Sequence, residues 1–364
     1  MIRFKQMDRV ARAGLVTVVA AVIGFSCAGL SAAIVENLYT VTVTRSLELA
    51  PGQVPRTRAD ETRFAMGQLL SRVTGRLDAA LEPALADLLQ NAGDFVVQFG
   101  AVDSETLLVT FDERAIEAAL VALNQPIWGP ERPLTLLWLA IDAGQGERGI
   151  LSAGEAFTDM SPEFLELQAR FREELTTVAE ERGLPLSLPL MDLQDMSALS
   201  FIDIWGGFTQ QVDQASIRYG ADAVLSGSAR VTGSGVRIQW RLLKDGNQFA
   251  LNGTSMRDGL DRVADFYAAE FSTFGGISAT LITVLGVETL DDYGRVMRYL
   301  ESLSMLESVG TEEFVDGALS IRVRARGRTA VLERVLQLST ILTPTAGPLG
   351  QAANDNQLTF TLTH

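Results

Sequence analysis

The sequence predicts an α+β fold, with ferredoxin-like (βαββαβ) N- and C-terminal domains flanking an α/β domain that has a mostly antiparallel three-stranded sheet. Of the 364 residues, 47% are hydrophobic and 21% are charged, a globular composition with room for two or three domains. Stretches in which apolar and polar residues alternate, typical of strands, are separated by stretches of helical period. The order strand, helix, two strands, helix, strand is predicted near both ends of the chain.

The first 33 residues have the order of an export signal. Basic residues in 1–12 precede an apolar stretch at 14–25, and small residues follow up to Ala33. This order predicts a signal peptide over residues 1–33 and an exported, periplasmic protein. The alternative is an inner-membrane anchor through residues 13–35, because this span carries no charge and is long enough to cross a bilayer.

Residues 34–141 are predicted to form the N-terminal ferredoxin-like domain. Its first helix should carry Phe64 on the same side as Leu69, Leu70 and Val73. A continuous apolar run at the end of the domain is typical of a central strand buried on both faces. The strands are expected at residues 39–44, 95–99, 106–111 and 134–141. The helices are expected at residues 58–73, at 81–89, and from a cap at Asp112 to about residue 123.

Residues 142–162 are rich in Gly, Ser and acidic residues and are predicted to be a linker. The segment from Gly144 to Gly149 satisfies the pattern G-x-G-x-x-G just after a predicted strand. A dinucleotide site also needs a helix that begins near the third glycine. No helical pattern begins there, so the sequence favours a flexible linker over a nucleotide site.

Residues 163–275 are predicted to form the middle α/β domain. Alternation and hairpin-type turns predict its three-stranded sheet, and a last amphipathic helix should cover one face of that sheet. Its strands are expected at residues 223–231, 236–243 and 248–256, with a further short strand at 186–188. Its helices are expected at residues 162–182, 207–219 and 258–271.

Residues 276–364 are predicted to form the C-terminal ferredoxin-like domain, because the element order of the first domain is repeated there. The strands are expected at residues 280–287, 305–315, 319–326 and 358–362, the last one at the sheet edge. The helices are expected at residues 290–303 and 328–338. The repeat is one of pattern alone, so it predicts architecture and not function.

Histidine and cysteine occur once each. Cys27 lies in the leader and His364 is the last residue, so the chain between them lacks both ligand types that zinc sites mostly use and the imidazole that Ser-His-Asp and Cys-His catalysis needs. Lys244, the one lysine outside the leader, begins a hairpin-turn motif, so we expect its amine in solvent. The sequence therefore predicts a protein that is not an enzyme and has no metal and no cofactor, with carboxylate chemistry as the remaining possibility.

The chain is acidic, with 30 Lys and Arg against 45 Asp and Glu and a formal net charge of −15. This balance argues against nucleic acid as a partner, because neutralising phosphates needs a basic face. Arg322, Arg324, Arg326 and Arg328 nevertheless occupy alternate positions on one face of a predicted strand and its exit. They are a candidate surface for an anionic partner, or a solvated face paired with Glu312 and Glu313 across the hairpin.

Asp192, Asp195 and Asp203 lie in an acidic stretch between predicted elements. Paired carboxylates could serve acid–base catalysis or bind calcium, while a surface loop with helix caps explains them equally well. Asp203 and Trp205 are the first pair to test, because the pattern places an aromatic ring beside a carboxylate.

Trp128 lies in a proline-rich stretch that leads into a predicted buried strand. Such a tryptophan could form a recognition groove for a peptide or a sugar. More often it caps a hydrophobic core.

The middle of the chain resembles a known family. The motifs are Trp128-Gly129-Pro130-Glu131-Arg132-Pro133, Arg182-Gly183-Leu184-Pro185, Pro189-Leu190-Met191-Asp192, Asp203-Ile204-Trp205-Gly206 and Ala215-Ser216-Ile217-Arg218-Tyr219-Gly220-Ala221-Asp222. Over residues 33–274 the chain resembles the bacterial domain-of-unknown-function family 2066, and residues 219–243 are more loosely similar to TolB-type N-terminal α/β modules. The resemblance implies an exported envelope protein of Gram-negative bacteria, and it carries over no catalytic residue.

The predicted function is that of a non-enzymatic periplasmic adaptor or scaffold that binds other envelope proteins. The absence of ordinary catalytic side chains and the export signal motivate this prediction. The alternative is a carboxylate-based hydrolase or a metal-dependent glycan-binding protein that uses Asp192, Asp195 or Asp203. Contact with a membrane is expected only through an uncleaved N-terminal anchor.

Overall fold

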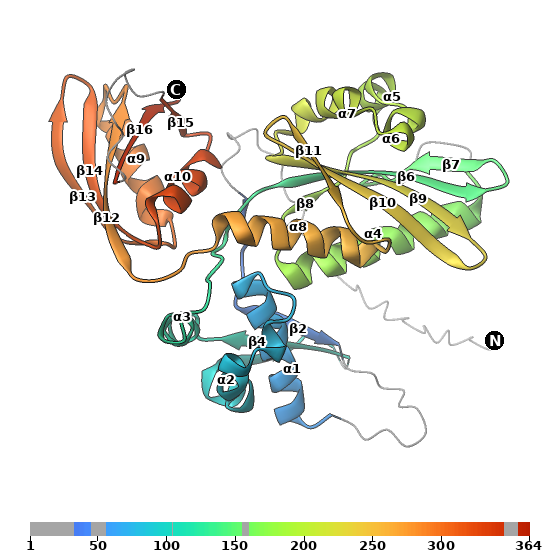
Figure 1. Ribbon diagram of the computed structural model, residues 1–364, viewed down its shortest axis with the longest axis horizontal. Coiled ribbons are helices and arrows are strands. Elements are labelled where there is room, and N and C mark those ends of the chain that lie inside the picture. The colour runs from blue at the N-terminus through green and yellow to red at the C-terminus, as the bar shows by residue number, and fades with distance from the viewer. Residues whose placement is uncertain (1–32, 45–55, 104, 155–159, 346–355) are drawn as a thin grey trace, which may run out of the picture.

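The computed structural model describes residues 33–44, 56–103, 105–154, 160–345 and 356–364, and the predicted signal peptide lies outside them apart from Ala33. These residues form a mixed α+β protein with several separate sheets. Figure 1 shows three units, which we define as the N-terminal unit (residues 33–129), the middle unit (residues 131–271) and the C-terminal unit (residues 277–364). No helix in the described part of the chain combines the length and the apolar character needed to span a membrane.

The N-terminal unit is an antiparallel sheet of order β2-β4-β3 covered by helix α1. The apolar side chains Met66, Leu69 and Val73 of α1 are buried against the sheet. The strands are β2 (Thr40–Thr44), β3 (Val96–Ala101) and β4 (Thr106–Phe111). The helices are α1 (Arg58–Thr74), α2 (Ala86–Gln90) and α3 (Glu113–Ala122), with 3-10 turns η1 (Ala79–Leu81), η2 (Pro83–Leu85) and η3 (Ala92–Phe95).

Local signals explain where these helices begin and end. Thr57 and Asp60 form a capping box at the start of α1, and Gly75 ends the helix in the left-handed conformation. Asp112 caps α3 by accepting a hydrogen bond from the backbone N–H of Ala115, as its position in the sequence predicts. The helix predicted at residues 81–89 is instead a series of short turns followed by α2.

The middle unit has a sheet of order β11-β10-β9-β6-β7, with β8 beside β6. Strand β6 pairs in parallel with β9 and β8, and the other pairs are antiparallel. The strands are β6 (Thr135–Gly144), β7 (Glu147–Ile150), β8 (Leu186–Ser187), β9 (Ala223–Thr232), β10 (Gly235–Lys244) and β11 (Asn247–Leu251). The helices are α4 (Pro162–Arg182), α5 (Leu193–Ala198), α6 (Phe201–Gly206), α7 (Thr209–Ser216) and α8 (Met256–Phe271), with η4 (Ile217–Tyr219) after α7.

Helices cover both faces of this sheet (Figure 1). On β6, Leu137 and Leu139 belong to the core that includes α4 and α8, whereas Leu136 and Trp138 belong to the core under α5, α6 and α7. Both sets of side chains are therefore buried, which explains why β6 is a continuous apolar run rather than an alternating one.

Two sequence predictions about this part of the chain are wrong. The strand predicted at residues 134–141 was assigned to the N-terminal sheet, but β6 pairs with β9 in the middle sheet, where helices on both faces can bury it. Residues 142–162 contain the end of β6 and the strand β7 rather than a linker throughout, and residues 155–159 lie outside the described residues. Gln145 and Gly146 adopt positive φ in the turn between β6 and β7, so glycine spacing here serves a hairpin.

The C-terminal unit has a five-stranded sheet of order β13-β14-β12-β16-β15 with helices α9 and α10. The strands are β12 (Ile277–Leu285), β13 (Leu306–Val315), β14 (Ala318–Arg326), β15 (Leu342–Pro344) and β16 (Gln357–Leu362), and the helices are α9 (Leu290–Ser302) and α10 (Thr329–Gln337). The strand predicted at residues 358–362 is present, but it is not an edge strand. It lies between β12 and β15, because the three-residue strand β15, too short for a sequence pattern to indicate, takes the edge.

The three units contact one another through apolar packing, polar groups and short strand pairings. One hydrophobic core cluster contains side chains of the middle and C-terminal units as well as Trp128 of the N-terminal unit. Strand β1 (Ala33–Ile34) pairs with β5 (Glu131–Arg132), and Ile127 forms a bridge with Thr273. Ser304 of the C-terminal unit donates to the buried Glu131 carboxylate from its backbone N–H at 2.6 Å and from its hydroxyl at 2.8 Å. Helix α8 of the middle unit lies at the centre of Figure 1, where the three units come together.

Candidate binding groove and the predicted site residues

Asp192 and Asp195 converge on the guanidinium group of Arg218. Arg218 Nη1 donates to Asp192 Oδ1 at 2.7 Å and to Asp195 Oδ1 at 2.8 Å, and Nη2 donates to Asp192 Oδ2 at 2.8 Å. The hydrogen bond from Arg218 holds the pKa of Asp192 well below its ordinary value. The point where the two carboxylates meet is therefore occupied by an arginine of the same unit.

The Asp195 side chain is fully buried and fixes the start of α5. Besides Arg218 it accepts hydrogen bonds from the Tyr219 hydroxyl at 2.5 Å and from the Met191 backbone N–H at 2.9 Å. Burial together with this hydrogen bond raises the pKa of Tyr219 to about 12. Asp192 caps the same helix by accepting from the Asp195 backbone N–H. These contacts correspond to the helix-cap interpretation of the acidic stretch.

Asp203 does not share the Arg218 site. It accepts hydrogen bonds from the backbone N–H and the hydroxyl of Ser200 at the start of α6, and these bonds lower its pKa. Trp205 stacks on Phe201 with ring centroids 5.3 Å apart, and the guanidinium of Arg230 lies 5.2 Å from its ring. Among the described residues no group of three or more His, Cys, Asp or Glu side chains could hold a metal ion.

Lys244 is not exposed, contrary to the sequence prediction. Its side chain is 12% exposed and pairs with Asp245 and, at 3.2 Å, with Glu270 of α8. Burial lowers the pKa of Lys244, but the two carboxylates outweigh burial and raise it above the ordinary value. The turn residues form the hairpin as predicted, while the long side chain folds back onto α8. The amine is therefore held in its protonated form.

Trp128 is fully buried. Its ring contacts the guanidinium of Arg132, whose carbon lies 3.8 Å from the ring centroid. Of the two interpretations offered by the sequence, the structure therefore favours a tryptophan in the core.

Arg132 is the centre of a buried cluster that we call the arginine junction, formed by Arg72, Arg132 and Arg182. All five N–H groups of Arg132 donate to backbone carbonyls, those of Arg72, Trp128, Gly129, Arg182 and Gly183, at 2.8 to 3.0 Å. Several of these carbonyls belong to the C-terminal ends of α1 and α4, where helix dipoles place partial negative charge. Burial lowers the pKa of Arg132 well below its ordinary value.

Arg72 and Arg182 extend the junction into neighbouring elements. Arg72 donates to the carbonyls of Leu38 and Thr40 beside the N-terminal sheet. Arg182 donates to the Gly75 carbonyl at 2.9 Å and pairs with Asp261 and Asp265 of α8 at 3.3 and 3.0 Å. The N-terminal and middle units are thus joined through buried arginine donors that bind carbonyls of both units.

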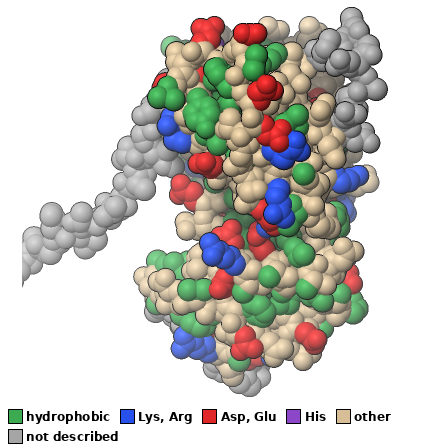
Figure 2. Space-filling view, turned by 90° about the vertical axis from the view of Figure 1, so that its left-hand side faces the viewer, with side chains coloured by type: hydrophobic (Ala, Val, Ile, Leu, Met, Phe, Trp, Pro, Cys, Tyr) green, Lys and Arg blue, Asp and Glu red, His purple; other side chains and the backbone are tan. Residues whose placement is uncertain are grey.

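The predicted arginine stripe divides between surface and interface. Arg322 forms an ion pair with Glu312, as predicted, and Arg324 lies 3.9 Å from Glu307. Arg326 is only 17% exposed and donates to Glu117 of α3 at 2.8 Å, so it joins the C-terminal unit to the N-terminal unit. In Figure 2 acidic and basic side chains are mixed over the visible face, and no large area of one sign appears.

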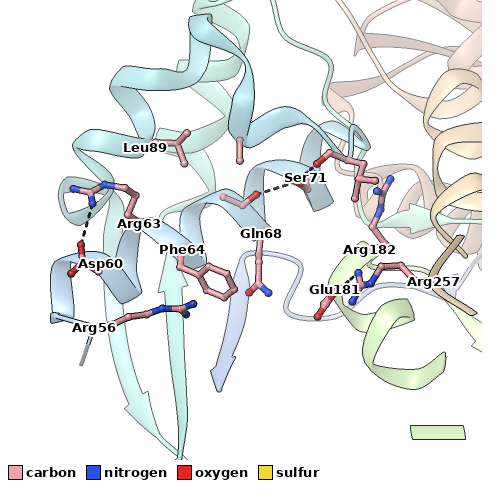
Figure 3. A pocket seen from close by; sticks show the side chains of 13 residues that line it. Arg56, Asp60, Arg63, Phe64, Gln68, Ser71, Leu89, Glu181, Arg182 and Arg257 are labelled. Atoms are coloured by element: carbon pink, nitrogen blue, oxygen red, sulfur yellow. Dashed lines mark hydrogen bonds and ion pairs between the residues drawn. The ribbon is translucent and has the colours of Figure 1, made fainter. Parts of the chain in front are cut away.

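A groove of about 550 Å³, which no sequence pattern indicated, lies along α1 where the N-terminal unit meets the middle unit (Figure 3). Asp60, Phe64, Gly67, Gln68 and Ser71 of α1 line it, and their spacing of three and four residues forms one face of the helix. The eleven residue-to-residue steps from Asp60 to Ser71 correspond to about 17 Å along the helix. The other lining residues are Arg56, Arg63, Leu77, Ala80, Leu89, Glu181, Arg182 and Arg257.

The groove combines exposed apolar side chains with arginines. Phe64 and Leu77 are 42% and 53% exposed. Arg63 pairs with Asp60 at 3.2 Å and Arg257 pairs with Glu181 at 2.7 Å, while Arg56 lies over the Phe64 ring at 4.5 Å. This surface can bind a ligand that has both an apolar part and a polar part.

The helical period explains why Phe64 lies in the groove and not in the core. Phe64 is separated by three or four residues from Asp60, Gly67 and Gln68, which share its face, whereas Leu69 and Val73 lie on the opposite side and are buried. The prediction that Phe64 lies on the same side of the helix as Leu69, Leu70 and Val73 is therefore wrong. Counting the period residue by residue would have found the groove face of α1, but not the wall supplied by Glu181, Arg182 and Arg257.

A family model described as a domain of unknown function (DUF8605) matches residues 32–129. The match ends just before β5 and includes α1, so it covers the groove face of that helix but not Glu181, Arg182 or Arg257. No curated protein and no solved structure matches the chain.

Proposed function

We propose that this protein is a non-enzymatic adaptor or scaffold of the cell envelope that holds a segment of a partner protein in the groove along α1. The groove is the observation that carries this proposal. It follows three turns of one helix, so its shape suits a length of polypeptide, and about five extended residues span 17 Å. Its walls come from two units joined by the arginine junction, so little ordering is needed on binding.

The alternative function, a carboxylate-based hydrolase or a metal-dependent glycan-binding protein, has less support. Asp192 and Asp195 are engaged by Arg218, and Asp203 is engaged by the start of α6. A catalytic carboxylate would have to exchange these partners for substrate. We therefore place the binding function in the groove.

The proposal includes export. The order of basic, apolar and small residues in the first 33 positions supports a cleaved signal peptide. Mass spectrometry of the protein extracted from the periplasm is expected to show a chain that begins at Ile34. A chain that retains residues 13–35 and sediments with membranes would support the anchored alternative instead.

We also propose the fold relationships that the sequence suggests. The C-terminal sheet contains the order β13-β14-β12 and has both helices at the positions that a ferredoxin-like domain requires, with β16 as an additional strand beside β12. The N-terminal sheet has the order β2-β4-β3, which is a ferredoxin-like arrangement without its fourth strand. The resemblance of residues 33–274 to family 2066, and of residues 219–243 to TolB-type modules, supports an envelope role.

Site-specific crosslinking in intact cells tests the adaptor function. A photoreactive amino acid replaces Gln68 in the groove, and in a matched control it replaces Arg298, an exposed residue of α9 in the C-terminal unit. We expect a discrete crosslinked envelope protein from position 68 and none from position 298. Equal crosslinking at both positions, or none at position 68, would contradict the proposal.

A further inference from the structure

Resting on that proposed function, we infer that the partner segment is acidic: an apolar side chain packs on Phe64 and Leu77, and a neighbouring carboxylate pairs with Arg56. The adaptor function by itself does not specify the chemistry of the partner segment. The inference of an acidic segment rests on two arginines of the groove, Arg56 and Arg182.

Arg56 is a cation whose interactions within the described residues are incomplete. Its guanidinium lies over the face of Phe64, and no carboxylate of the described chain pairs with it. A cation held on an aromatic face keeps the N–H groups at its rim for an acceptor, and a guanidinium fork matches the geometry of a carboxylate. Phe64, 42% exposed, offers apolar surface at the same place.

Arg182 supplies an independent observation at the other end of the groove. Its side chain is 2% exposed, yet it lines the groove, and its buried Nε has no hydrogen-bond partner in the described part of the chain. Its two terminal nitrogens are occupied by Asp261, Asp265 and the Gly75 carbonyl. An unsatisfied buried donor costs free energy, and an oxygen of a ligand bound at this end would satisfy it.

The charges that line the groove favour an acidic segment over a basic one. Arg56, Arg63, Arg182 and Arg257 face two carboxylates, Asp60 and Glu181, each of which is already paired with an arginine of the lining. A lysine or arginine of a partner would meet like charge without a free acceptor. The chain as a whole has a net charge of −15, so a short acidic segment is favoured over a large acidic surface.

Binding of defined peptides tests the inference. The probes are two fluorescein-labelled hexapeptides, each with a central Phe-Leu pair, flanked by glutamates in one and by lysines in the other, and anisotropy reports their binding to the mature full chain. We expect the glutamate peptide to bind at least about tenfold more tightly than the lysine peptide, with affinity falling as salt is raised. Arg56→Glu and Phe64→Ala should each weaken it about tenfold, whereas Arg298→Glu, the same charge change on an exposed residue of α9, should not.

The outcomes separate this inference from the adaptor function. Equal affinity for the two peptides, or an Arg56→Glu variant that binds normally and has an unchanged circular dichroism spectrum, would overturn the acidic segment. If crosslinking from position 68 then captures a partner whose crosslinked segment is neutral or basic, the adaptor function survives without it. If neither peptide binds and vesicles of anionic lipid bind through Arg56, the groove receives a lipid headgroup and both proposals fail.

Discussion

Arg132 and Arg322 are the same residue type in opposite environments. Arg132 is fully buried, has no carboxylate partner among the described residues and donates all five of its N–H groups to carbonyls. Arg322 is more than half exposed and forms one ion pair across a hairpin. The comparison teaches that a buried guanidinium can be held without a carboxylate, by backbone dipoles and an aromatic ring, when two helices end at the same point. An exposed ion pair, by contrast, adds little in water.

The difference follows from what each side chain leaves behind when it is removed. Without Arg322, Glu312 returns to solvent at small cost. Without Arg132, carbonyls at the ends of α1 and α4 lose their donors inside the protein, where water does not reach them. We therefore expect the arginine junction, and not the surface pairs, to determine the stability of the contact between the N-terminal and middle units.

Replacement of Arg132 should give the largest effect. Arg132→Met fills a similar volume but donates no hydrogen bond, so we expect the free energy of unfolding to fall by about 3–5 kcal/mol in urea titrations. Arg132→Lys should restore little, because an ammonium has three donors and cannot match the five carbonyls. A loss below about 1 kcal/mol for Arg132→Met would show that the carbonyls find other donors, and the comparison would fail.

Gly183 tests the same junction through the backbone. Its φ of 63° is left-handed, and a Cβ at this position would lie 2.7 Å from Arg132 Nη1. We expect Gly183→Ala to destabilise the protein by about 2–3 kcal/mol, because it adds backbone strain and displaces the guanidinium. Gly233→Ala is the matched control, since nothing lies within 4 Å of the added methyl group. Equal thermal midpoints for the two variants would argue against a tightly packed junction.

Asp222 is a partly buried group of the opposite charge, and it tests how much partial burial costs a carboxylate. Its carboxylate accepts from the Leu134 N–H at 2.7 Å, and burial raises its pKa from 3.8 to about 6. The folded state therefore binds a proton that the unfolded state has released between about pH 4 and 6, so stability is lost as the pH rises through this range. Asp222→Asn should remove about 2 kcal/mol of this pH dependence, measured by urea titration at pH 4 and pH 7.

If the stability of Asp222→Asn changes with pH as that of the unmodified protein does, the ionised Asp222 carboxylate is stabilised by its neighbours about as well as by water. Asp222 would then resemble Arg132, as a charged group that backbone hydrogen bonds stabilise. The control is Asp213→Asn, an exposed carboxylate of α7.

The sequence predicted local structure well because its signals are local. Asp112 starts α3 where its side-chain chemistry predicts, and the alternation over residues 236–243 places β10 correctly. It did not predict the partner of β6. A continuous apolar run indicates that both faces of a strand are buried, but it does not indicate to which sheet the strand belongs. The edge strand β15 was missed for a related reason, since three residues contain too little periodicity.

The candidate site was hardest to predict because it is assembled from distant segments. Arg257 and Glu181 come together only when α4 and α8 lie side by side, and Arg56 joins them from another unit. The aspartates that the sequence singled out do meet in part, but the residue they meet is Arg218. No spacing rule connects Asp195 to an arginine 23 positions away.

Replacement of an exposed arginine should give the smallest effect on stability. Two arginines of β14 that differ in exposure test this expectation. Arg324→Ala removes a charge that is 59% exposed and 3.9 Å from Glu307, so the urea midpoint should not change measurably. Arg326→Ala, on the same strand face, should lower the midpoint clearly, because it leaves the half-buried Glu117 between two units without its cation. Equal responses from the two variants would mean that burial does not determine the contribution of an arginine here, because the strand face and the side-chain type are the same in both.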